Sequence, residues 1–262
     1  MLRLALALAC VLLPGLGVAQ AQELAEAGKL TWGVSVTFPP FEFQENAKPV
    51  GFDVDFVDAM AKQMGLASTI MPIEFKGLIP ALLGKRIDII VSGMYINPQR
   101  LEVADMVPYL LVGNQIVVRK GNPKKIDGKA SLCGLSVAAP VATVFENSAK
   151  AASADCKAAG KPEVALLSLA GTTACALALT QGRADAIIVS TATVAALNHE
   201  TPDTYDTGGA PFDTDTKVGI AVRKDNPALK AAVEKAVQAI VKDGTYAALL
   251  KKWSLPAGSS AF

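Results

Sequence analysis

The chain has 262 residues, of which 25 are basic and 24 acidic, and 51% are hydrophobic. This balance of charge leaves no electrostatic footprint for nucleic acid or for an anionic membrane surface, so neither is expected as a partner. The length is sufficient for one large domain or for two smaller ones.

Residues 1–21 have the composition of a secretory signal peptide. Arg3 is their only charged residue, an apolar stretch covers Leu4–Val18, and Ala19-Gln20-Ala21 has the small-x-small form that signal peptidase cleaves after. A membrane anchor would need a longer unbroken apolar run of about 20 residues. We therefore expect residues 1–21 to be removed and the mature protein to be soluble in the periplasm.

Strand and helix signals alternate along the rest of the chain. Alternating apolar residues predict a strand over 30–36, and Asp53 is a suitable cap for a helix that stops near Gly65. Further strands are predicted at 69–75, 86–91, 135–139, 164–167 and 184–189, and further helices at 78–83, from 144, at 173–181 and at 229–240. This order predicts an α/β fold with mainly parallel sheets flanked by helices.

Two near-repeats indicate that the chain forms two similar lobes. RIDIIVS at 86–92 resembles RADAIIVS at 183–190, and VVRKGNP at 117–123 resembles AVRKDNP at 221–227. Together they predict two lobes joined by two crossing strands, which form a hinge suited to closure around a ligand. The crossings are expected near 112–118 and 217–222. The predicted division is signal peptide 1–21, lobe 1 from 22–113 and 219–262, and lobe 2 from 114–218 including the hinge strands.

Three cysteines follow the signal peptide, and two of them are expected to pair in an oxidising compartment. We predict the pair Cys133–Cys156, because Cys175 lies among alanine and leucine residues and has the surroundings of a small buried side chain. The chain has a single histidine, His199, and no paired-cysteine spacing, so neither a metal site nor a cofactor is expected.

Short motifs in a fixed order carry the strongest indication of function. They are FPPFEF (38–43), GFDVD (51–55), GLIPAL (77–82), DIIVSGM (88–94), NPQR (97–100), LCG (132–134), GRADA (182–186), GIAVR (219–223), DGT (243–245) and KW (252–253). In this order and spacing, the chain resembles the periplasmic solute-binding proteins of polar amino-acid and opine importers, family 3 of the extracellular solute-binding proteins. The resemblance implies a type II two-lobed fold that captures a small polar carboxylate for the permease of an ABC importer, without catalysis and as a monomer.

One arginine is the predicted carboxylate anchor. Asn97 is a good helix N-cap and Pro98 suits the first turn, so Arg100 lies beside exposed N–H groups, where its guanidinium fork can hold a carboxylate. In the family, the matching arginine holds the ligand's α-carboxylate, and the resemblance gives Arg100 that role. Three further candidate ligand contacts follow a predicted strand, where ligands of open α/β sheets bind: Ser92, Gly93 and Met94.

Lobe 2 and the aromatic residues complete the predicted site. Residues 143–146 have the form of a capping box, and the resemblance implies that Ala142 and Thr143 also offer N–H and hydroxyl donors to the same carboxylate. Phe38 and Phe75 match family positions that sandwich the ligand, and Tyr95 replaces a smaller residue there. Apolar walls with few polar anchors are typical of ligand sites.

One position departs from the family. In its amino-acid binders, an aspartate follows the second-lobe strand and takes the ligand's ammonium group, whereas here Ser190 stands at that position and no carboxylate follows before Glu200. An unpaired buried ammonium costs about 2–5 kcal/mol. Three ligand types therefore stay open: a carboxylate without an ammonium, a betaine-like methylated ammonium caged by aromatic rings, or an amino acid held by a carboxylate elsewhere.

Two other functional classes use this fold. A cyclohexadienyl-dehydratase-like enzyme needs an acid or base in the cleft, and the candidate positions offer no carboxylate or histidine, so we expect the protein not to be an enzyme. His199 is expected in a surface loop. A ligand-sensing receptor module needs a downstream transmembrane span, which the sequence up to Phe262 does not contain.

Overall fold

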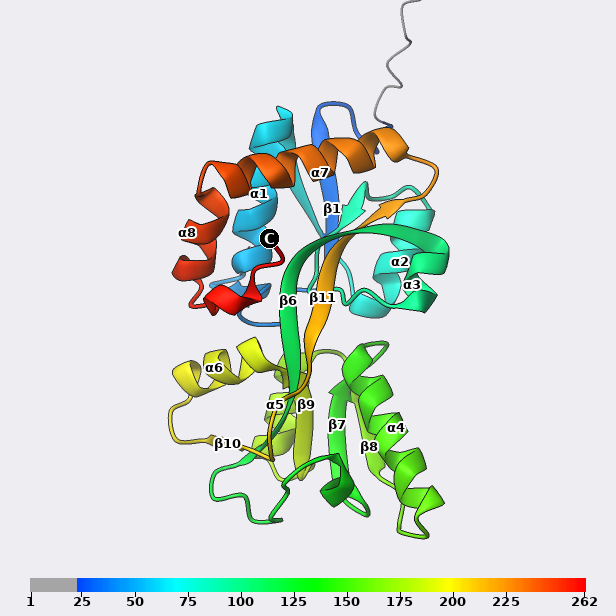
Figure 1. Ribbon diagram of the computed structural model, residues 1–262, viewed down its shortest axis with the longest axis vertical. Helices are drawn as coiled ribbons and strands as arrows, with labels where there is room; N and C mark the ends of the chain where they lie inside the picture. Colours follow the sequence, from blue (N-terminus) through cyan, green and yellow to red (C-terminus); the bar gives the residue numbers. More distant parts are fainter. Residues whose placement is uncertain (1–22) are drawn as a thin grey trace, which may run out of the picture.

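The computed structural model describes residues 23–262, so the predicted signal peptide lies outside the described residues. Figure 1 shows two bodies, one above the other, joined by the two long strands β6 (Ala104–Arg119) and β11 (Phe212–Arg223). We call the upper body, which contains both ends of the described chain, lobe 1, and the lower body lobe 2. Both predicted crossings lie within these two strands, so the two-lobed α/β architecture is confirmed.

Nine strands form one sheet that continues through both lobes, in the order β4-β1-β5-β11-β6-β9-β7-β8, with β10 paired to β6. The pairs β1–β4, β1–β5, β7–β8 and β7–β9 are parallel, and every pair that involves β6 or β11 is antiparallel. The remaining bounds are β1 Lys29–Val34, β4 Ala67–Pro72, β5 Ile89–Ile90, β7 Ser136–Pro140, β8 Ala165–Leu169, β9 Ala186–Ser190 and β10 Tyr205–Thr207, and a separate hairpin pairs β2 Phe43–Glu45 with β3 Lys48–Val50.

Helices cover the sheet in both lobes (Figure 1). Lobe 1 contains α1 Phe52–Met64, α2 Phe75–Leu83, α3 Pro98–Val103, α7 Pro227–Lys242 and α8 Thr245–Lys252, and lobe 2 contains α4 Val144–Ala158, α5 Thr172–Thr180 and α6 Thr191–Glu200. Short 3-10 turns occur at Lys129–Leu132 and Ala257–Ser259. None of the helices within residues 23–262 has both the length and the apolar character that crossing a membrane requires.

Helix α1 begins before the predicted cap, so the assignment of Asp53 as a capping residue is wrong. Gly51 is the N-cap, and a Cβ there would lie 2.1 Å from the Phe41 carbonyl oxygen, which excludes a larger residue. Asp53 is fully buried and accepts hydrogen bonds from the Gly93 amide at 2.9 Å and the Tyr109 hydroxyl at 2.8 Å. Its carboxyl group therefore ties α1 to the segment that follows β5 and to β6.

The near-repeats occupy equivalent positions in the two lobes. The Asp88 amide donates to the Thr31 carbonyl at 2.7 Å, and its carboxylate accepts from the Thr31 amide at 2.8 Å. Asp185 makes the same two bonds with Ser136, at 2.7 and 3.0 Å. Each aspartate thus joins the start of one parallel strand to its neighbour, β5 to β1 and β9 to β7. The second near-repeat ends each hinge strand at an arginine, Arg119 in β6 and Arg223 in β11.

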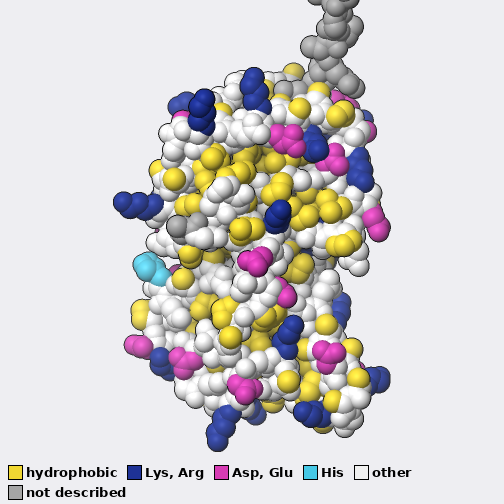
Figure 2. All heavy atoms as spheres, viewed as in Figure 1, with side chains coloured by type: hydrophobic (Ala, Val, Ile, Leu, Met, Phe, Trp, Pro, Cys, Tyr) yellow, Lys and Arg dark blue, Asp and Glu magenta, His cyan; other side chains and the backbone are white. Residues whose placement is uncertain are grey.

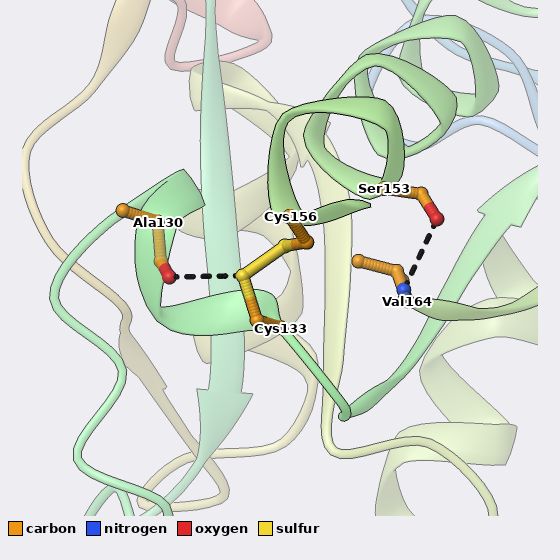
Figure 3. The surroundings of a disulfide bond; sticks show 5 residues. All are labelled: Ala130, Cys133, Ser153, Cys156 and Val164. Atoms are coloured by element: carbon orange, nitrogen blue, oxygen red, sulfur yellow. Dashed lines mark hydrogen bonds between the residues drawn. A yellow bond between two sulfur atoms is a disulfide. The ribbon is translucent and has the colours of Figure 1, made fainter. Parts of the chain in front are cut away.

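A disulfide bond links Cys133 to Cys156, as predicted, and joins the turn after Lys129–Leu132 to the last turn of α4. Figure 3 shows the bond beside a second contact of the same helix, in which the Ser153 hydroxyl accepts from the Val164 amide at 3.1 Å. Cys175 is free and buried in α5, also as predicted. Together these contacts attach the end of α4 to the base of lobe 2.

Charged side chains of both signs are interspersed over the two lobes on the face shown in Figure 2. This face has no area where basic side chains gather. The distribution agrees with the balanced composition of the chain.

Candidate ligand-binding site

A pocket with about 440 Å³ of empty space, part of it open to solvent, lies between the lobes. Lobe 1 contributes Ser35, Thr37, Phe38, Glu42, Phe75, Gly93, Tyr95 and Arg100, and lobe 2 contributes Pro140, Val141, Thr143, Val144, Phe145, Ala170, Gly171 and Thr172. Six of the ten ligand-binding residues predicted from the sequence are therefore brought together around one space: Phe38, Phe75, Gly93, Tyr95, Arg100 and Thr143.

The lobes are closed over this cavity. An Arg100 Nη2 donates to the Ala142 carbonyl at 3.3 Å, and the Thr193 hydroxyl donates to the Pro39 carbonyl at 3.0 Å, so hydrogen bonds cross the gap at two places. Gly171 approaches Thr37 so closely that a Cβ at this position would lie 2.3 Å from the Thr37 hydroxyl oxygen. A small residue at 171 is therefore a condition for this degree of closure.

Arg100 is held in the cavity as the sequence predicted. The Asn97 side chain caps α3 by accepting from the Arg100 amide at 2.9 Å. The guanidinium donates to the Tyr95 carbonyl at 2.6 Å and to Ala142, and its carbon lies 5.3 Å from the centre of the Phe75 ring. Two of its five N–H groups are thus engaged, which leaves three for a ligand. Burial lowers the pKa of Arg100 to about 10, and no nearby carboxylate among the described residues offsets that effect.

Aromatic rings form the walls. The Phe145 ring of lobe 2 lies edge-on to two rings of lobe 1, with its centre 5.8 Å from that of Phe38 and 5.5 Å from that of Tyr95. Aromatic contacts therefore join the two lobes. The Tyr95 hydroxyl points to the hinge, where it donates to the Asn114 side chain on β6 at 3.1 Å. Burial, with a smaller contribution from Asp213, raises the pKa of Tyr95, so the phenol stays protonated.

The N-termini of two lobe 2 helices face the cavity, α4 at Thr143 and α5 at Thr172. Helix N-termini present amide groups that lack an intrahelical partner and attract anions. The Thr143 hydroxyl donates to the Pro140 carbonyl at 2.6 Å and accepts from the Glu146 amide at 3.3 Å. Its proton is therefore already engaged, and what α4 offers a ligand is its backbone amides.

Four predicted ligand contacts do not line the cavity. Ser92 is fully buried, and Met94 packs into the core beside α2. The Ala142 amide donates to the Glu146 carboxylate at 3.0 Å, and Ser190 is the buried N-cap of α6. Ser190 is held at that place because it pairs with Asn114 of the hinge strand and its hydroxyl accepts from the Thr193 amide. These residues support the walls of the cavity rather than forming them.

Sequence reasoning missed Glu42, Gly171 and Thr172. The expectation that the cleft holds no carboxylate is wrong, because Glu42 lines the cavity. Glu42 lies between two phenylalanine residues in a turn that pairs Phe38 with Glu42, a position with no periodic signal. Gly171 and Thr172 follow a strand and open a helix, so the reasoning used for residues 92–94 would have found them. His199 lies in the last turn of α6, not in the predicted loop, and is exposed.

Residues 30–256 match the family of bacterial extracellular solute-binding proteins, family 3. The chain belongs to this family. Among curated relatives, the L-cystine-binding protein TcyJ of Escherichia coli is 31% identical over 235 residues, which are 88% of this chain and 84% of the relative. The arginine-binding protein ArgT of Corynebacterium glutamicum is 31% identical over 244 residues, covering 90% of this chain and 78% of the relative.

Solved structures confirm the two-lobed fold of the family for this chain. An ancestral arginine-binding protein bound to arginine superposes with a TM-score of 0.80 and 35% identity, over 86% of this chain and 98% of the other. The structure described as an ancestral arginine-binding protein bound to glutamine gives a TM-score of 0.80 and 34% identity, over 88% of this chain and all of the other. The type II periplasmic binding protein fold predicted from the sequence is thereby confirmed.

Proposed function

We propose that this family 3 solute-binding protein captures a small amino acid between its lobes and presents it to the permease of an ABC importer. The observation that carries the proposal is Arg100, a half-buried cation with no carboxylate partner among the described residues and with three unused N–H groups in a closed interlobe cavity. An α-carboxylate supplies the missing partner, and the amides at the start of α4 approach the same space from lobe 2. The relatives described as cystine- and arginine-binding proteins support a ligand of this class.

A binding role fits this site better than catalysis. The relatives are named as binding proteins, and the one carboxyl group that lines the cavity, among residues 23–262, is fully buried in the floor. The signal-like residues 1–21 support a periplasmic location. We expect the protein to act as a monomer, because closure of two lobes on one hinge completes the cavity within a single chain. We also expect the lobe boundaries to lie at the positions predicted from the sequence.

A thermal-shift panel tests this function. The protein is unfolded, dialysed and refolded to remove bound ligand, then heated with each amino acid, L-cystine included. A ligand at a hundredfold excess over its Kd adds about 2.7 kcal/mol to the free energy of unfolding, and we expect a shift of that order for at least one amino acid. If no amino acid shifts the transition while a sugar or a metal salt does, the proposed ligand class is wrong.

A further inference from the structure

The backbone of Tyr95 is fixed to lobe 1. Tyr95 follows β5, and hydrogen bonds to hinge strand β11 hold the chain on either side of it. The Ile96 amide donates to the Lys217 carbonyl at 2.8 Å, and the Gly219 amide donates to the Met94 carbonyl at 2.9 Å. Tyr95 therefore moves with the part of β11 that belongs to lobe 1.

The Tyr95 hydroxyl reaches the other hinge strand. It donates to Oδ1 of Asn114 on β6 at 3.1 Å, and both residues are only 3% exposed. Asn114 is the first residue of β6 that pairs with a strand of lobe 2, since it lies opposite Ser190 of β9. This hydrogen bond therefore joins the two lobes at the hinge, and it is buried at both ends.

The pairing of the two hinge strands is interrupted at the same place. Thr216 of β11 lies opposite Val112 of β6, and Phe212 lies opposite Asn114, so residues 213–215 face a single residue of β6. A bulge of this kind disrupts the ladder and bends the strand that carries it. The tyrosine side chain spans this bend, from β11 on its lobe 1 side to β6 on its lobe 2 side.

A residue of the bulge orients the acceptor. Asn114 donates from Nδ2 to Oδ2 of Asp213 at 3.2 Å, which directs its Oδ1 to the Tyr95 hydroxyl. Asp213 has a φ of 49°, in the left-handed region that Asp and Asn tolerate better than most residues. Side chains from the cavity wall and from both hinge strands thus form one hydrogen-bonded chain, Tyr95–Asn114–Asp213.

Tyr95 also connects this chain to the ligand-binding space. Its ring lines the cavity, and its carbonyl accepts from the Arg100 guanidinium at 2.6 Å. A carboxylate held by Arg100 therefore lies beside the residue whose hydroxyl reaches the hinge.

We propose that Tyr95, Asn114 and Asp213 form a latch that couples occupation of the cavity to closure, with Asn114 and Asp213 as positioning residues that act through Tyr95. A ligand on Arg100 fixes Tyr95, and its hydroxyl closes on Asn114. Loss of the hydroxyl leaves the Asn114 oxygen buried without its donor in the closed form alone, because water reaches this oxygen when the lobes separate. The inference rests on the proposed function only for the identity of the occupant.

Tyr95→Phe keeps the ring and removes the hydroxyl. Dyes attached through Lys76→Cys and Lys150→Cys, two exposed positions on different lobes, report closure of the ligand-free protein by single-molecule fluorescence energy transfer. We expect the ratio of closed to open molecules to fall about fivefold or more. Tyr246→Phe is the matched control and should keep the wild-type ratio, because its buried hydroxyl donates within lobe 1 and does not line the cavity.

Ligand kinetics separate a latch from a merely structural bond. The same proteins are mixed with L-arginine, L-glutamine and L-cystine in stopped-flow experiments. Because the apparent affinity scales with the closed fraction, we expect the affinity of Tyr95→Phe to fall by the same factor. The loss should lie in the dissociation rate, with the association rate within about twofold of wild type. A hydroxyl that only stabilised the fold would lower the free energy of unfolding without changing the dissociation rate.

Substitutions of the partners test the chain itself. Asn114→Leu removes the acceptor, so a protein with both Tyr95→Phe and Asn114→Leu has no orphaned oxygen at this point and should bind no more weakly than the weaker single variant. Asp213→Gly keeps the left-handed backbone without the carboxylate and should lose part of the affinity. Asp213→Asn restores an acceptor and should recover it.

Two results overturn the latch. One is equal closed fractions and equal dissociation rates for Tyr95→Phe and Tyr246→Phe, and the other is additive losses in the protein with both Tyr95→Phe and Asn114→Leu. If none of the three amino acids binds, the proposed function is contradicted, and the closed fraction of the ligand-free proteins still decides on the latch.

Discussion

Arg100 lies in the cleft, where two of its N–H groups donate to carbonyl oxygens and its planar guanidinium lies over the Phe75 ring. Replacement by alanine removes the charge and the fork, and we expect the affinity for an amino acid to fall at least 30-fold. Arg100→Lys keeps the charge but not the bidentate geometry, so we expect an intermediate loss. Titration calorimetry of both variants measures the effect. Equal affinities for wild type and Arg100→Ala would remove Arg100 from the site.

The buried carboxyl pair Glu42 and Asp53 makes stability depend on pH in a direction that can be worked out. Because folding raises the pKa of Glu42 and of Asp53, the native state holds more protons than the unfolded state above about pH 4.5. This contribution to stability is full below the unfolded pKa and is lost as pH rises through the folded pKa, by up to about 1.4 kcal/mol per unit for each proton.

Glu42→Gln isolates the contribution of one of these protons. We expect its free energy of unfolding, relative to wild type, to increase steadily from pH 5 to pH 8 in urea titrations. Parallel pH profiles for the two proteins would show that Glu42 does not hold a proton in the native state.

Local signals predicted part of the site and failed where tertiary register decides. Asn97 and Pro98 predict the start of α3, and the structure places Arg100 in the first turn of this helix, as predicted. Ser190 ends a strand, but it pairs with Asn114 of β6 and is buried as the N-cap of α6. No residue near Ser190 in the sequence indicates this register. The position of Glu42 in the site depends on the turn that pairs it with Phe38, and the sequence does not indicate this pairing.

The boundaries of the elements show the same division between local and long-range causes. The strand predicted over 69–75 ends at Pro72, although the Ile73 amide still donates to the Val34 carbonyl at 2.9 Å, and α2 starts at Phe75 rather than at Leu78. The predicted strand over 86–91 is reduced to Ile89–Ile90, flanked by the bonds that Asp88 makes with Thr31. The alternation of strand and helix was predicted for most of the chain, but α6 was not among the predicted elements, because its apolar residues do not gather on one face.

The disulfide is the clearest test at the scale of an element. It closes a loop with a sequence separation of 23 residues, and we expect replacement of Cys133 and Cys156 by alanine to lower the free energy of unfolding by about 3 kcal/mol. Ligand affinity should stay unchanged, because neither cysteine lines the cavity. Chemical unfolding followed by circular dichroism measures the first effect and calorimetry the second. Superimposable unfolding curves would show that the bond does not constrain lobe 2.

At the scale of the whole molecule, closure depends on how near α5 can approach Thr37. A Cβ at position 171 would meet the Thr37 side chain, so we expect Gly171→Ala to hold the lobes slightly apart and to weaken ligand binding, with little change in the stability of the ligand-free protein. Gly258→Ala is the control, because a Cβ at that position meets nothing within 4 Å. Small-angle scattering should show a smaller radius of gyration on ligand addition for the control and a reduced change for Gly171→Ala. The same compaction in both proteins would contradict this reading of the cleft.

The most direct test of amino-acid capture is calorimetric comparison of each amino acid with the amine left after decarboxylation: L-arginine with agmatine, L-glutamine with 4-aminobutanamide, and L-cystine with cystamine. These pairs differ at the group assigned to Arg100. We expect at least one amino acid to bind the refolded, ligand-free protein and its decarboxylated partner to bind at least 30-fold more weakly. If the amine binds as tightly as the amino acid, the cleft does not recognise a carboxylate, and both the ligand class and the role of Arg100 are wrong.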